Sequence, residues 1–438
     1  KDKALNRFYH NTTAYYNGYF NAREIIKEQN KEFVKNNIED YSELIPVNYY
    51  PDEEQSKGFF PEMNRAIDKT SVVITKHAMP KEKKGRSATK EYGKWIDENW
   101  IVMGQSYFYK REWDEAIEKF EYVAKMYEKD EAKYYAKLWL AKTYIQMEKY
   151  PKALKYLDEI ENERDQKESK DSNAKASKKR KKSNAKRKRK RSKGRKRRKK
   201  SKVSVTKKRE AAKEEKSFLV EFPEEMTEDF EATLADYYLR TGEYKDAIDH
   251  LELAIENGDK KQRVLRYKFI QAQLYQNMNN NVKASELYAY VVKKNAPYRM
   301  SFYSKINSAL IASNTNRKEL KEDLLKLAKD IKYTEFRDQI YYALGDLELQ
   351  EYKRDEGIGF LEKSASYPPS NKTQKAKTFL RLADVYYEEK DYVFAQKYYD
   401  STLSVLNNEN ENYGIVKDKN ENLTRLVSYI NTIALQDS

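Results

Sequence analysis

Apolar residues recur along this chain at helical spacing, and no stretch shows the sustained alternation that a strand requires. The run FEATLADYYL, residues 230–239, places apolar side chains three and four positions apart, and a second such run covers 244–255. Thr241-Gly242 separates the two runs and Asn257-Gly258 closes the second. Glycine best tolerates the left-handed conformation that follows a helix. The pattern predicts an all-α chain built from consecutive helix pairs.

A fixed spacing of small, aromatic and bulky residues recurs five times within these helical runs. A tyrosine follows the small residue by three positions, an alanine comes nine positions later, and a bulky residue comes four positions after that. The five sets are Gly104, Tyr107, Ala116 and Phe120; Ala141, Tyr144, Ala153 and Leu157; Ala235, Tyr238, Ala247 and Leu251; Ala272, Tyr275, Ala284 and Tyr288; and Ala383, Tyr386, Ala395 and Tyr399.

This spacing is typical of the tetratricopeptide repeat (TPR), a helix pair of about 34 residues. The small residues let the two helices approach closely, while the larger ones fill the space beside them. Two further repeats, at Ala309 and Gly345, are degenerate. Ala312 and Glu348 replace their tyrosines, and Gly357 replaces an alanine. The sequence therefore predicts an all-α TPR superhelical solenoid with five clear repeats and two degenerate ones.

The repeats divide the chain into six segments. We expect an N-terminal helical segment at 1–45, a loop-rich segment with one helix at 46–90, TPR repeats 1 and 2 at 91–163, a disordered Lys/Arg-rich insertion at 164–217, TPR repeats 3 to 7 at 218–408 and a C-terminal helix at 409–438.

The insertion carries all of the chain's net positive charge. In residues 178–200, 18 of 23 are Lys or Arg, and the formal net charge of the whole chain is +16. Like charges at this density cannot pack, so the sequence predicts a disordered loop. Its basic residues include Lys178, Lys179, Arg180, Arg187, Arg189, Arg191, Arg195, Arg197 and Arg198.

Three interpretations of this basic loop stay open. It is a solvated tether, or charge alone draws it to an anionic surface such as lipid headgroups or a cell-wall polymer. Alternatively, it serves nuclear targeting or nucleic-acid binding. The composition disfavours nucleic acid, because no aromatic residues interleave the run.

The sequence predicts no catalytic site, no metal site and no cofactor. Cysteine is absent, which excludes disulfides, thiolate metal sites and cysteine catalysis. The three histidines, His10, His77 and His250, lack a second ligand at metal spacing. No phosphate-binding loop or nucleophile elbow is present. We therefore expect a non-enzymatic protein that works by binding other proteins.

In TPR arrays the first helix of each pair lines a concave groove. The equivalent positions here are Gln105, Lys142, Asp236, Gln273, Asp346 and Asp384, which we expect to be exposed as a candidate groove. Their mixed charge disfavours a clamp for an acidic chaperone tail, which needs Lys, Asn and Arg. A peptide or helix in the groove remains open.

The N-terminal segment narrows the choice of family. The sequence TAYYNGYFNA at 13–22 lies in a predicted long helix, and VNYYP follows at 47–51. This opening, followed by TPR repeats, resembles the SprE/PorW family of TPR lipoproteins, which belong to the type IX secretion and gliding-motility machinery of Bacteroidota. The specificity of the resemblance rests on the opening segment, because TPR repeats occur in many families.

The resemblance implies a periplasmic scaffold that links an outer-membrane translocon to a periplasmic ring of lipoprotein and partner subunits. It also implies a lipid anchor in the outer membrane, on a cysteine just upstream of Lys1. The alternative is a nuclear or RNA-associated TPR adaptor that uses the basic loop.

Overall fold

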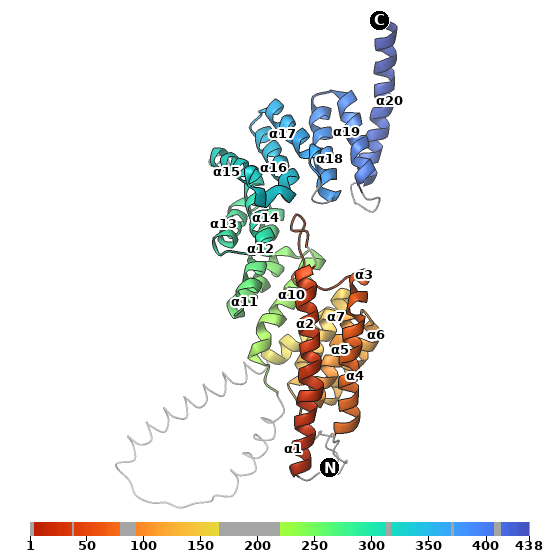
Figure 1. Ribbon diagram of the computed structural model, residues 1–438, viewed down its shortest axis with the longest axis vertical. Helices are drawn as coiled ribbons and strands as arrows, with labels where there is room; N and C mark the ends of the chain where they lie inside the picture. Colours follow the sequence, from red (N-terminus) through yellow and green to blue (C-terminus); the bar gives the residue numbers. More distant parts are fainter. Residues whose placement is uncertain are drawn as a thin grey trace, which may run out of the picture. The chain divides into compact units, whose positions relative to one another are not determined.

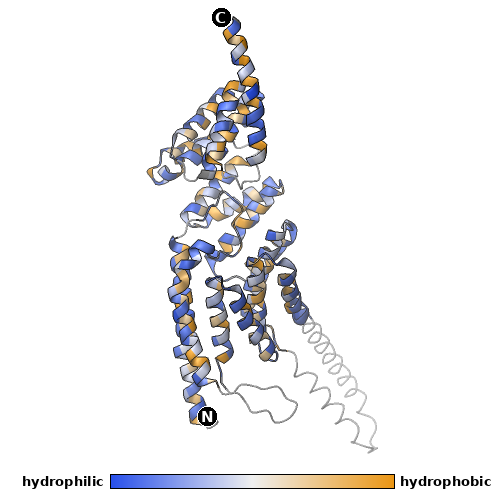
Figure 2. Ribbon diagram, turned by 90° about the vertical axis from the view of Figure 1, so that its right-hand side faces the viewer, coloured by the Kyte–Doolittle hydropathy of each residue, from blue (hydrophilic) through white to orange (hydrophobic). Residues whose placement is uncertain are grey.

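The computed structural model describes residues 4–36, 39–78, 93–165, 220–311, 317–368, 372–406 and 413–437. Every regular element in those ranges is a helix, so the predicted all-α TPR class is confirmed (Figure 1). Hydrophobic and hydrophilic residues interleave along the helices (Figure 2). In the described ranges no helix is both long and apolar enough to cross a membrane. The basic loop residues, from Lys178 to Arg198, lie outside the described residues.

The repeats form seven helix pairs. They are α5 (Ile96–Tyr109) with α6 (Trp113–Met126), α7 (Ala132–Gln146) with the helical segment 150–165, α10 (Thr227–Thr241) with α11 (Tyr244–Asn257), α12 (Lys261–Asn277) with α13 (Asn281–Lys293), α14 (Tyr298–Leu310) with α15 (Arg317–Lys329), α16 (Arg337–Gln350) with α17 (Arg354–Ser366), and α18 (Lys372–Glu388) with α19 (Tyr392–Val405). Two short 3₁₀ turns, η5 (Glu224–Met226) and η6 (Ile331–Phe336), precede α10 and α16, and α20 (Tyr413–Asp437) follows α19.

The segment before the repeats is also helical. A continuous helical stretch consists of α1 (Ala4–Thr13), the π-helical η1 (Ala14–Phe20) and α2 (Asn21–Asn36). An irregular segment leads from it to α3 (Glu53–Ser56), η2 (Lys57–Phe59) and α4 (Phe60–His77). The chain forms two compact units, Lys1–Tyr267 and Lys268–Ser438. The first unit therefore contains this N-terminal segment and the first three helix pairs.

The turn inside a helix pair follows one rule in six of the pairs. The residue four positions after the signature tyrosine, or after Glu348, has a left-handed backbone. The next N–H then donates to the carbonyl of that tyrosine, as from Glu112 to Tyr107 at 3.0 Å and from Glu243 to Tyr238 at 2.9 Å. Only the third pair places glycine there, Gly242. A search of the sequence for glycine would therefore have located only one of these six turns.

The signature residues lie where the two helices of a pair meet. Phe120 is fully buried, and its ring lies 2.6 Å from the point where a Cβ on Gly104 would stand. In every clear repeat, the alanine nine positions after the tyrosine and the bulky residue four positions after that alanine are also fully buried. The tyrosines are less buried, and three of them stack on the residue twelve positions later. These pairs are Tyr144 with Tyr156, Tyr238 with His250, and Tyr386 with Tyr398.

The degenerate sixth repeat uses its glycines for a closer helix contact. A Cβ on Gly345 would lie 2.7 Å from Leu361 Cγ and 3.0 Å from the carbonyl of Gly357. A Cβ on Gly357 would lie 2.7 Å from Leu349 Cγ and 3.1 Å from the carbonyl of Gly345. The two backbones therefore touch at a point where an alanine does not fit. Glu348, in the tyrosine position, is fully buried and pairs with Lys321 of α15 at 2.6 Å.

Restoring the repeat's usual alanine at this point is expected to destabilise the second unit. We expect Gly357→Ala to cost about 1–2 kcal/mol, because overpacking outweighs the gain in helix propensity. The matched control is Gly359→Ala in the same helix, where a Cβ would meet nothing within 4 Å. We expect the control to stabilise the unit by about 0.5–1 kcal/mol. Circular dichroism during urea unfolding measures both, and equal effects would contradict the close backbone contact.

Candidate protein-interaction site

The first helices of the three pairs in the first unit are α5, α7 and α10, and the start of α12, as far as Tyr267, belongs to the same unit. We call the surface that they build the first-helix face. Of the six candidate groove residues, Lys142, Asp236 and Gln273 are buried, and Gln105, Asp346 and Asp384 are half-buried. The expectation that these six side chains are exposed is therefore wrong for Lys142, Asp236 and Gln273.

At least four of these six side chains have polar partners within the chain. Lys142 Nζ lies 2.5 Å from Asp229 Oδ2 and 4.8 Å from the centre of the Trp139 ring. In the second unit, Arg381 Nε donates to Asp346 Oδ1 at 3.0 Å, and the Tyr399 hydroxyl donates to Asp384 Oδ1 at 2.5 Å. Buried charges need such partners, because desolvation penalises a charge that is left alone.

Asp236 is covered by the chain's own N-terminal segment. We call residues 39–51, between α2 and α3, the inner segment. It contains no helix or strand, and its Ile45 and Val47 are each 2% exposed. The N–H of Val47 donates to Asp236 Oδ1 at 3.0 Å, across 189 positions of sequence. Arg240 Nε donates to the other oxygen of Asp236 at 3.1 Å.

Arg266 of α12 holds the same segment through its whole guanidinium group. Nη1 and Nη2 pair with the two carboxylate oxygens of Glu39 at 2.5 and 2.6 Å. Nη2 also donates to the carbonyl of Pro46 at 2.6 Å, and Nε donates to the carbonyl of Val47 at 3.1 Å. This bidentate geometry suits arginine, since its planar fork matches a carboxylate. Arg266 thus binds both a side chain and the backbone of the inner segment, which turns back on itself between Glu39 and Pro46.

Aromatic packing fixes the end of the inner segment against α5. The ring of Tyr50 meets Phe108 edge-on, with centres 4.9 Å apart, and burial raises the pKa of Tyr50 well above its usual value. Pro51 is buried, and Arg111 Nη1 donates to its carbonyl at 3.4 Å. The segment therefore contacts α5 and α10 directly and reaches α12 through Arg266.

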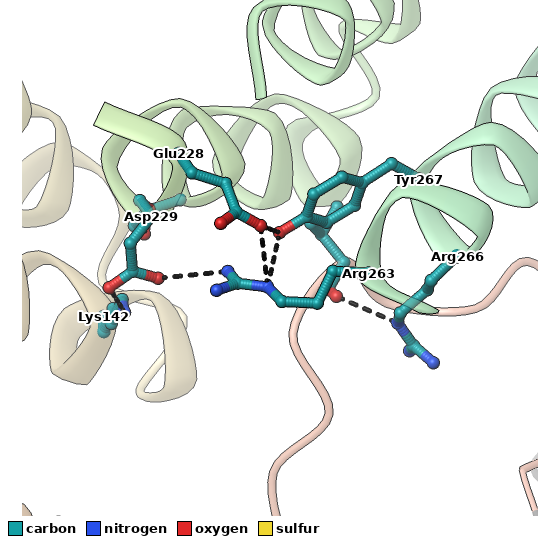
Figure 3. Close-up of polar contacts among 8 residues, drawn as sticks. Lys142, Glu228, Asp229, Arg263, Arg266 and Tyr267 are labelled. Carbon is teal, nitrogen blue, oxygen red and sulfur yellow. Dashed lines mark hydrogen bonds and ion pairs between the residues drawn. The ribbon is translucent and has the colours of Figure 1, made fainter. Parts of the chain in front are cut away.

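A polar cluster beside the inner segment joins three of the first helices (Figure 3). Asp229 of α10 pairs with Lys142 of α7, and Arg263 of α12 lies 3.0 Å from Glu228 and 3.7 Å from Asp229. Figure 3 also shows Arg266 directed away from this cluster toward the pale red inner segment. Burial alone would raise the pKa of Asp229, but Lys142 and Arg263 outweigh it and lower that pKa.

A second buried carboxylate, Glu231 of α10, holds the helices of two neighbouring repeats together. Its side chain is 3% exposed and lies 2.9 Å from Arg164 Nη1 and 2.8 Å from His250 Nδ1. Burial of Glu231 would raise its pKa, but the hydrogen bonds from His250 and Arg164 lower it overall. His250 is thus a packing histidine, stacked on Tyr238.

The other two histidines meet, although they are 67 positions apart. The Nδ1 atoms of His10 and His77 lie 2.9 Å apart, so one ring donates and the other accepts. Within the part of the chain that the structure describes, no three His, Cys, Asp or Glu side chains gather in a way that could hold a metal ion. The pair links α1 to the end of α4.

Comparison with protein families gives one match. A family model described as "Tetratricopeptide repeat" matches residues 101–168, which include most of the first two helix pairs. This match implies a scaffold for protein–protein interaction and indicates no catalytic family. A search of curated protein sequences found no match.

Comparison with solved structures returns matches of low sequence identity. PilF of Pseudomonas aeruginosa is 21% identical with a TM-score of 0.32, and the match covers 47% of this chain and 93% of that one. The apo form of RapI is 9% identical with a TM-score of 0.44, and the match covers 80% of this chain and 96% of that one. At these identities and scores, neither likeness carries an argument about function.

Proposed function

We propose that this chain is a non-enzymatic scaffold of the type IX secretion system, anchored by an upstream lipid to the periplasmic face of the outer membrane. There it links the outer-membrane translocon to periplasmic ring subunits. The TPR repeats supply surfaces for such protein partners. The observation that carries the specific proposal is the opening TAYYNGYFNA at 13–22 with VNYYP at 47–51, which resembles the SprE/PorW family.

The opening segment packs directly against α5 in the first unit. Ala14, Gly18 and Ala22 of the opening are buried. The Asn99 side-chain amide donates to the carbonyl of Ala14 at 3.1 Å, and Asn99 Oδ1 occupies the place where a Cβ on Gly18 would stand. The small residues of the motif thus let η1 lie directly on α5, so the motif has a packing reason of its own.

Deletion of the gene tests the proposal. We expect a clean deletion strain to lose extracellular type IX cargo completely while cargo synthesis is unchanged, because a scaffold acts after synthesis. Immunoblots of the culture medium and of whole cells measure both, and a plasmid copy serves as the control. Normal extracellular cargo in the deletion strain would refute the proposal.

The basic run favours a second candidate, a nuclear or RNA-associated TPR adaptor. Eighteen basic residues within 178–200 can neutralise many phosphates. The upstream coding sequence separates the two candidates. A signal peptide ending in a lipidation-site cysteine supports the secretion scaffold, whereas an initiating methionine without a signal peptide supports the adaptor.

A further inference from the structure

We propose that the first-helix face of the first unit is a binding site for a non-helical peptide that turns back on itself, and that the inner segment occupies it in cis. The partner is a protein carrying a looped segment of similar chemistry, with a carboxylate followed seven and eight positions later by proline and a small apolar residue, so that the carboxylate and the proline carbonyl reach the same arginine. This inference is independent of the type IX proposal, since it rests on contacts within the first unit alone.

The contacts are those of a ligand lying on a receptor surface. The inner segment forms no regular structure of its own, and its backbone bonds at Pro46 and Val47 go to side chains of α10 and α12. Backbone recognition by Asp236 and Arg266 does not depend on sequence. The Glu39 carboxylate on Arg266 and the buried Val47 supply the selectivity.

The site is also built of charges that need an occupant. Asp236 is 2% exposed and its Oδ1 accepts the N–H of Val47, while every nitrogen of the Arg266 guanidinium bonds to the inner segment. Without a segment lying there, both groups would have to be hydrated. An incoming peptide with a carboxylate and free backbone groups would restore the same bonds.

Tethering decides which ligand is bound. The inner segment is connected to α2 and α3 at its two ends, so its effective concentration at the face is on the order of millimolar. A free peptide of equal intrinsic affinity is therefore excluded at micromolar concentration. A partner displaces the segment only if it binds more tightly or if the segment is released.

The test uses the full chain and a fluorescent synthetic peptide with the sequence of residues 39–52. Fluorescence anisotropy measures binding to the wild type and to the double variant Ile45→Asp/Val47→Asp, which weakens the inner segment and leaves the face unchanged. We expect no binding to the wild type at about 10 μM peptide, because the tethered segment outcompetes it. We expect at least tenfold tighter binding to the double variant.

Adding Arg266→Lys to the double variant provides the specificity control. Lysine keeps the charge but cannot form the bidentate and carbonyl bonds, so we expect binding to weaken at least tenfold. If tryptophan emission shows that the double variant is unfolded, Val47→Ala takes its place. A folded variant that binds no better than the wild type would overturn the proposal, as would binding that does not depend on Arg266.

Discussion

Replacing Arg266 with alanine is expected to lower the free energy of unfolding of the first unit by about 3–5 kcal/mol, the usual cost of removing one partner of a buried ion pair. The side chains of Arg266 and Glu39 are 16% and 10% exposed, so solvent screens the pair little. The substitution also leaves the carbonyls of Pro46 and Val47 without the donors that they have now.

Tryptophan fluorescence during urea unfolding measures this effect. The chain has four tryptophans, and all of them, Trp95, Trp100, Trp113 and Trp139, lie in the first unit. The matched control is Arg65→Ala, in which an exposed arginine of the same unit loses its pair with Glu62. We expect the control to change stability by less than about 0.5 kcal/mol. Equal losses in the two variants would mean that Arg266 is not the anchor of the inner segment.

Replacing Glu231 with glutamine is expected to cost about 2–3 kcal/mol at neutral pH. Glutamine keeps the shape of the side chain but loses two charge-assisted hydrogen bonds, to Arg164 and His250. Because Trp139 lies in the neighbouring repeat, tryptophan fluorescence again reports the transition. Glu62→Gln, at a solvent-exposed pair on α4, serves as the matched control.

The effect of Glu231 on stability is expected to depend on pH. The pKa of Glu231 is lower in the folded chain than its usual value of 4.5. Its stabilising effect is therefore fully present above pH 4.5 and is lost as the pH falls through the lowered pKa. We expect the wild type to lose its advantage over Glu231→Gln as the pH falls below about 4.5. A difference that stays constant down to about pH 3 would contradict this account.

The sequence predicted the helix pairs because their packing is local and repeated. The small residue and the bulky one of each repeat meet across a single turn, as Gly104 meets Phe120, so their spacing is readable along the chain. The close contact of Gly345 with Gly357 was not predicted. A search for the usual tyrosine and alanine counts this repeat as degenerate, although its two glycines bring α16 and α17 closer together.

The inner segment could not be predicted, because its contacts span most of the first unit. Glu39 and Arg266 are 227 positions apart, and nothing in either local sequence marks the pair. Equivalence between repeats correctly located Asp236 on a first helix. The position of Asp236 within the repeat does not reveal that the chain's own inner segment covers its side chain. A run such as Ile45-Pro46-Val47, extended and apolar before a pair of tyrosines, is the one signal that points to a buried loop.

Thiol reactivity shows whether the inner segment covers the first-helix face. The chain has no cysteine, so a single introduced cysteine reports on one position. Ile45→Cys places the thiol at a site that is 2% exposed, and Glu43→Cys places it at an exposed site in the same segment. We expect a thiol reagent to label the Ile45→Cys chain at least tenfold more slowly than the Glu43→Cys chain, and Arg266→Ala to abolish most of the difference. Equal labelling rates at the two positions in the otherwise unchanged chain would show that the inner segment does not cover the first-helix face.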